Sequence, residues 1–168
     1  MITVNKTLII IFLVFILGLF DIQYIAKYSY AVPGGIPGIC NSIARITKQS
    51  DLSFGAMLVD YAGTISIDTN DSTTTTGGVS RFGGAISTAR FQVRGCPDKV
   101  YSIVLPTQTT LNTAAASMNV DNFISNPAVG LLDPNGNQNL AVGARLNIST
   151  SQAPGDYTGS FAVEVIFE

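Results

Sequence analysis

The chain has no histidine and no tryptophan, only two cysteines, and few charged residues, which make up 12% of its 168 residues. Without histidine there is no Ser-His-Asp or Cys-His catalytic arrangement and no zinc site that uses histidine. The formal net charge is −2, and no basic cluster is present to neutralise a phosphate backbone. We therefore expect neither an enzyme nor a nucleic-acid-binding protein.

Carboxylates are the remaining groups that could support hydrolysis or hold a metal ion. Most of them fall at predicted strand ends and turns, where Asx hydrogen bonds with the backbone account for them. The segment from Asp68 to Asp71 could hold calcium, but it lacks the glycine and the distal glutamate of a calcium loop. The sequence predicts no catalytic residue, no cofactor and no metal site.

The N-terminus has the three parts of a secretory signal peptide. Lys6 precedes an apolar run over residues 8–20, and Ser29-Tyr30-Ala31 forms a small-x-small cleavage pattern, with Ala26 as an alternative site. The other interpretation, a retained membrane anchor, is disfavoured because the run is too short for the roughly 30 Å hydrocarbon core. We predict a cleaved signal peptide over residues 1–31, and no membrane span after cleavage.

Both cysteines, Cys40 and Cys96, follow the predicted signal peptide. Export to an oxidising compartment favours a disulfide between them, which would stabilise the fold by roughly 4 kcal/mol on the loop-entropy model. The alternative is lipidation of Cys40, which is disfavoured because this residue lies far beyond the apolar run. The segment before it, residues 32–40, is a Pro- and Gly-rich arm that cannot form a regular helix.

Period-2 alternation of apolar residues dominates the rest of the chain. It is clearest over residues 88–94, 140–149 and 155–168, with turn residues between, of which residues 133–136 are the strongest turn signal. Residues 69–78 are a polar segment that we predict to be a loop, and residues 114–118 could form one helical turn. The pattern predicts a single all-β domain over residues 41–168, an immunoglobulin-like or pilin-like β-sandwich of about seven to nine antiparallel strands.

The last fourteen residues form the most apolar of these predicted strands. Five side chains share one face, namely Tyr157, Phe161, Val163, Val165 and Phe167. Such a face must be buried in its own domain or offered to a partner by β-strand addition.

The chain also resembles a known family through an ordered set of short motifs. They lie at residues 51–55, 77–79, 89–95, 101–106, 118–123, 142–146 and 152–161. Together they resemble the bacterial family known as domain of unknown function 4402 over about residues 41–168. The resemblance implies a secreted or cell-surface bacterial β-domain without catalytic residues.

The C-terminal end is similar to pilin subunits of chaperone–usher fimbriae, including those like spore coat protein U. Gly155 is the fourteenth residue from the end, and the aromatic Phe167 is penultimate. The resemblance implies an assembly face made of Gly155, Tyr157, Phe161, Val163, Val165 and Phe167. It also implies a periplasmic chaperone and like subunits as partners, and a homo-oligomer. One departure is the arm over residues 32–39, whose two prolines cannot donate to a β-ladder.

Two functions from different classes follow. The first is a fimbria-like structural subunit that associates by strand complementation, located in the periplasm, at the cell surface or in a fimbrium. The alternative is a self-contained extracellular binding module or adhesin. Its ligand contacts would lie in loops, such as residues 69–78 and 112–126.

Overall fold

The computed structural model describes residues 21–28 and 44–167, and this part of the chain consists of β-strands and connections without a helix. The predicted all-β class is confirmed. The strands are β1 (Asp21–Tyr28), β2 (Arg45–Ser50), β3 (Ala56–Ile67), β4 (Thr73–Gly83), β5 (Ala89–Arg94), β6 (Val100–Val104), β7 (Gln108–Asn112), β8 (Ser117–Asn126), β9 (Gly130–Leu131), β10 (Asn137–Ile148) and β11 (Ser160–Phe167). The Pro- and Gly-rich arm and the rest of the predicted signal peptide lie outside the described residues.

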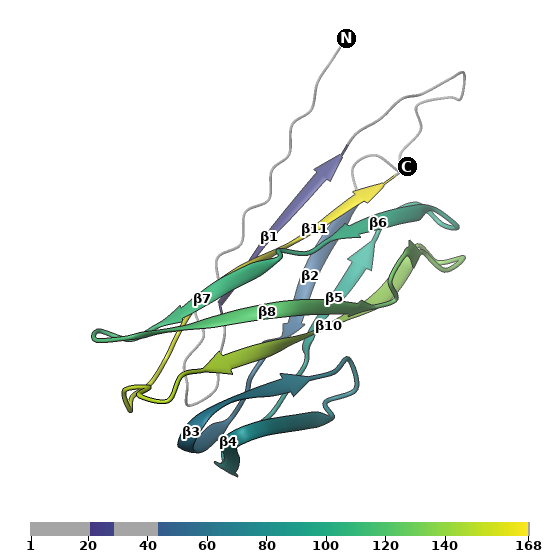
Figure 1. The fold of residues 1–168 in the computed structure, drawn as a ribbon. Coiled ribbons are helices and arrows are strands. Elements are labelled where there is room, and N and C mark those ends of the chain that lie inside the picture. The colour runs from purple at the N-terminus through teal and green to yellow at the C-terminus, as the bar shows by residue number, and fades with distance from the viewer. Residues whose placement is uncertain (1–20, 29–43, 168) are drawn as a thin grey trace.

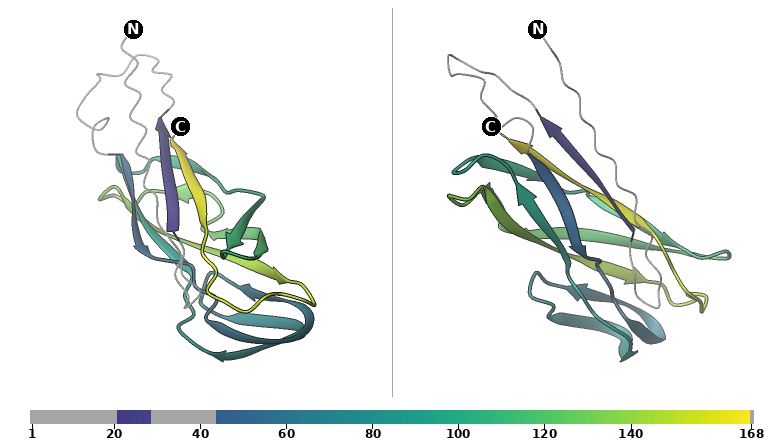
Figure 2. Two further views of the ribbon diagram at one scale, coloured as in Figure 1. Left: turned by 90° about the vertical axis from the view of Figure 1, so that its left-hand side faces the viewer. Right: turned by 180° about the vertical axis from the view of Figure 1, so that it is seen from behind.

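The strands form two sheets that pack as a β-sandwich (Figures 1 and 2). The smaller sheet has the order β1-β11-β6-β9. The larger one contains β2, β5, β10, β3 and β4, with the β7–β8 hairpin attached through β8 to β10. All pairings between named strands are antiparallel except that of β1 with β11, which is parallel.

Strand β10 organises the larger sheet because three strands share it. Along one edge its first half pairs with β5 and its second half with β3, while β8 runs along the other edge. Gly143 of β10 lies between Ala144, which pairs with the last residue of β3, and Val142, which pairs with the first residue of β5. A Cβ on Gly143 would lie 2.3 Å from the carbonyl oxygen of Ile67. Only glycine lets the two strands meet at this point, so the sheet divides into a β5–β2 part and a β3–β4 part.

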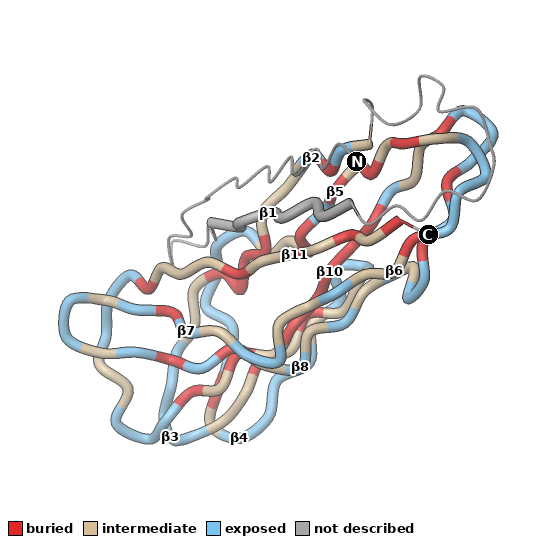
Figure 3. Tube along the Cα trace, turned by 90° about the horizontal axis from the view of Figure 1, so that it is seen from above, coloured by how far each residue is buried: buried red, intermediate tan, exposed pale blue. Residues whose placement is uncertain are grey.

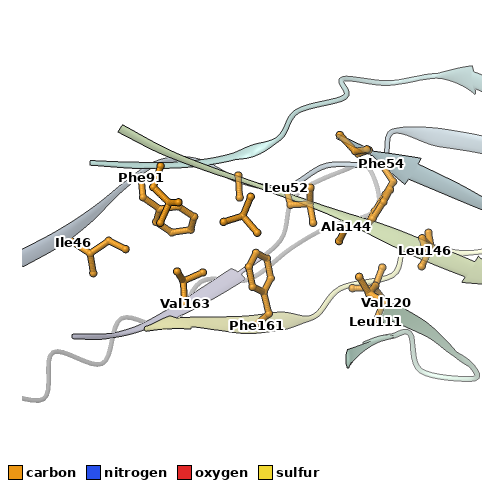
Figure 4. Close-up of a cluster of buried hydrophobic side chains, with 14 of the residues drawn as sticks. Ile46, Leu52, Phe54, Phe91, Leu111, Val120, Ala144, Leu146, Phe161 and Val163 are labelled. Carbon is orange, nitrogen blue, oxygen red and sulfur yellow. The ribbon is translucent and has the colours of Figure 1, made fainter. Parts of the chain in front are cut away.

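The core lies between the sheets and is built from the predicted alternating faces. On β10 every second residue from Leu140 to Ile148 is buried, and on β5 Ala89, Phe91 and Val93 are buried. In Figure 4, Phe161 and Val163 of β11 extend across the core toward Phe91 of the opposite sheet. The burial colouring of Figure 3 shows the same alternation along β11.

Several elements differ from the sequence prediction. Their residues are exposed, so no apolar alternation in the sequence indicated that they form strands. The predicted polar loop over residues 69–78 largely belongs to β4, an edge strand of threonines and glycines paired with β3. The segment that could form a helical turn is instead the tip of the β7–β8 hairpin, closed by a bond from Thr113 N to Ala116 O. With these hairpins the predicted domain contains ten described strands, β2 to β11, where about seven to nine were predicted.

Candidate functional site

The candidate site is strand β11 together with its two edges. Its inner face is buried, since Phe161, Val163, Val165 and Phe167 are each at most 6% exposed. The ring of Phe161 lies 4.8 Å from that of Phe123, measured between centroids. The burial predicted from the alternation is therefore present, while the assembly role of this face stays a prediction.

One edge of β11 is only partly covered by its own domain. Strand β6 pairs with the last four residues, from Glu164 to Phe167. Near the start of β11, Thr109 Oγ1 donates a hydrogen bond to Ser160 O (2.6 Å), and the bridge between Asn112 and Thr158 continues this contact. The short strands β6 and β7 thus share this edge.

The other edge of β11 is paired along its whole length with β1. Figures 1 and 2 show the two strands side by side and running in the same direction. The register places Ile22 opposite Phe161 and Tyr24 opposite Val163, and ends with Tyr28 opposite Phe167. Sequence reasoning missed this strand because residues 21–28 fall within the predicted signal peptide. The signal that could have found it is the alternation of Ile22, Tyr24, Ala26 and Tyr28.

Two of the predicted assembly residues lie away from this edge. Gly155 is exposed in the loop before β11, where its φ of +150° favours glycine. Tyr157 is buried, and its hydroxyl donates to Ala153 O and accepts from Gln152 Nε2, both at 2.5 Å. The register with β1 begins only at Ser160, so these two residues shape the loop rather than the paired edge.

At the end of β11, Phe167 contacts a buried tyrosine with an unsatisfied hydroxyl. The Tyr101 ring lies 5.3 Å from the Phe167 ring, and a Cβ on Gly130 would lie 1.9 Å from it. Tyr101 is 0% exposed, and its hydroxyl has no hydrogen-bond partner among the described residues. Burial raises the pKa of Tyr101 to about 12.

We expect Tyr101→Phe to leave the free energy of unfolding unchanged at pH 7 or to raise it by about 1 kcal/mol, because it removes an unpaired buried hydroxyl. Unfolded tyrosine has a pKa of about 10. The folded state therefore holds this proton more tightly, and the associated stability is present below pH 10 and is lost as the pH rises toward 12. Urea unfolding from pH 8 to 11.5 measures both effects. The variant should show a weaker alkaline loss than the native chain, and parallel curves would contradict the assignment.

The two predicted disulfide partners cannot be compared directly. Cys96 is half-buried in the turn after β5, whereas Cys40 lies outside the described residues. The disulfide between them stays a prediction.

The segment considered for calcium uses its carboxylates within the protein. Asp68 Oδ1 accepts from the backbone N–H groups of Asn70 (2.7 Å) and Ser72 (2.9 Å). Asp71 accepts from Thr88 N (2.6 Å) and Arg90 Nη2 (2.7 Å), and the backbone bond from Thr88 is the main cause of its lowered pKa. In the described ranges, no three His, Cys, Asp or Glu residues gather as metal ligands would.

The comparisons with known proteins concern the domain as a whole. Searches of the curated proteins and of the solved structures returned no match. The part of the chain that the structure describes contains no helix that is long enough and apolar enough to span a membrane. The resemblance to fimbrial subunits stays a prediction. A family model described as "Domain of unknown function (DUF4402)" matches residues 45–167, and the chain therefore belongs to this family.

Proposed function

We propose that this protein is an exported structural subunit that associates with a partner by adding a β-strand to the outer edge of β11. The observation that carries the proposal is the eight-residue ladder between β1 and β11. It supports the proposal because the edge accepts an extended segment along its whole length. The alternating face beneath that edge supplies the core contacts.

Signal-peptide processing connects this ladder with assembly. Cleavage after Ala31 would remove residues 21–28 together with the rest of the leader. Every backbone N–H and C=O that β11 directs toward β1 would then lose its partner, because β1 is the neighbour of β11 on that side of the smaller sheet. An open edge of this kind recruits a strand from another chain.

The partner strand must be extended and alternately apolar, as residues 21–28 are. The arm over residues 32–39 is a poor donor, because it contains two prolines and three glycines. The chain accordingly accepts a strand better than it gives one, as a terminal rather than a repeating subunit would. A periplasmic chaperone would supply the strand in the periplasm, and a like subunit would supply it at the cell surface or in a fimbrium.

The test uses the processed chain, residues 32–168, and a synthetic peptide with the sequence of residues 21–28. We expect the peptide to bind and to slow hydrogen exchange at the backbone amides of β11. A peptide of the same composition, in which apolar and polar residues no longer alternate, should not bind. The proposal fails if the processed chain is monomeric, protects its β11 amides without any peptide and binds neither peptide.

A further inference from the structure

The outer face of the β2–β5–β10 part of the larger sheet is polar, and it lies opposite the core. Phe91 and Val93 of β5 are buried, so Arg90, Gln92 and Arg94 share the other face of the strand. Two cavities lie at the two ends of this face. One of about 440 Å³ is next to Arg94, and one of about 270 Å³ is next to Arg90. We call this surface the outer polar face.

The first cavity contains a pair of like charges. Arg45 of β2 and Arg94 of β5 are direct partners in the antiparallel register, and both line the cavity. Arg94 Nε donates to Gln92 Oε1 (3.0 Å), and Arg45 makes no ion pair with a described residue. Like charges directly opposite each other destabilise a sheet. Among the described residues no carboxylate lines this cavity, so an anion bound between the two guanidinium groups would offset their repulsion.

The second cavity is lined by uncharged amides. Gln49, Asn70, Asn126 and Asn139 come from four separate segments, and their side chains make no hydrogen bond with a described residue. Arg90 also lines this cavity, but its charge is neutralised by Asp71 at 2.7 Å. A carboxamide both donates and accepts hydrogen bonds, as a sugar hydroxyl does. This end of the face therefore suits a neutral, hydroxyl-rich group.

The distance between the two ends is greater than the length of one sugar ring. Arg90 and Arg94 are four residues apart on one strand, which is about 13 Å. Gln92 and its register partners Thr47 and Asn139 lie between them and continue the polar surface. A ligand that reaches both cavities must be a chain with an anionic group at one end and hydroxyl groups along it.

We propose that the outer polar face binds an acidic polysaccharide of the uronic-acid type. The carboxylate of one sugar residue lies between Arg45 and Arg94, and the amides of the second cavity bind hydroxyl groups of a residue further along. Guanidinium groups match a planar carboxylate with two parallel hydrogen bonds. This inference is independent of strand addition, because the face lies on the opposite sheet from β11.

The test is a titration of the purified protein that begins at Asp21, which keeps β1, with trigalacturonate, followed by calorimetry and by amide chemical shifts. The control ligand is the methyl ester of the same trisaccharide, which keeps the rings and hydroxyls but has no charge. We expect the acid to bind, to weaken as salt increases, and to bind at least about tenfold more tightly than the ester. Shifts should map to β2, β5 and β10.

Variants test whether binding depends on the two ends of the outer polar face rather than on the overall charge of the protein. R45Q/R94Q should lower the affinity at least about tenfold, and R45K/R94K should lower it less, because lysine keeps the charge but loses the fork. Arg81→Gln is the matched control, since it removes an exposed arginine of β4. Asn126→Ala should weaken binding and leave the salt dependence unchanged. Equal affinities for acid and ester, an equal loss in Arg81→Gln, or no binding at millimolar concentration would overturn the proposal.

Discussion

A chain that begins at Val32 should be measurably less stable than one that begins at Asp21, and it should associate in solution. The longer chain keeps the ladder along β11, in which each net hydrogen bond contributes about 1 kcal/mol before the cost of ordering the strand. The shorter chain leaves that edge open beside a buried apolar face. Urea unfolding gives the difference in stability, and light scattering after size exclusion gives the oligomeric state.

Two point variants of the longer chain are matched controls for this comparison. Tyr24 is in register with the buried Val163, whereas Gln23 is in register with the half-exposed Ala162. Tyr24→Asp should therefore reproduce much of the loss seen on truncation, and Gln23→Asp should leave the stability nearly unchanged. If both chain lengths are equally stable and monomeric, the β11 edge is complete without an added strand, and the proposed function loses its basis.

Replacing Phe161 by alanine should lower the free energy of unfolding by about 3–5 kcal/mol. The side chain is 3% exposed and contacts the partly buried Phe123 of β8 in the opposite sheet, so its removal leaves a cavity between the two sheets. The matched control is Phe82→Ala, because Phe82 is 72% exposed at the end of β4. We expect that control to change the stability by less than about 0.5 kcal/mol.

Urea unfolding of the chain that begins at Asp21 measures both phenylalanine variants under the same conditions. Using this longer chain keeps β1 in place, so that the result reports packing rather than strand loss. Similar small losses in the two variants would mean that the face of β11 does not hold the sheets together. The terminal strand would then be an appendage, contrary to its position in the core.

The strands that the sequence predicted best are those with one buried face. On β5, β10 and β11 the core selects an apolar residue at every second position, so the alternation appears directly in the sequence. Strand β4 could not be found in this way, because its threonines face solvent on an edge where no core selects them. The turn at residues 133–136 was predicted correctly, and Gly136 N does donate to Asp133 O.

Other features depend on pairings between distant parts of the chain. Arg45 and Arg94 are far apart in the sequence, and only the register of β2 with β5 makes them neighbours. The division of the larger sheet at Gly143 likewise follows from three strands sharing β10. Strand β1 was missed for a different reason, since the residues after an apolar leader run are ordinarily read as part of the leader.

The direction of the ladder on β11 has a mechanical consequence. The hydrogen bonds between two paired strands lie across the strand axis, and here they extend over the full length of β11. Tension applied along that axis to an added strand would load all of them in shear at once. Tension applied across it would open them one after another from one end. An attachment at this edge would therefore resist pulling along the strand and yield to peeling.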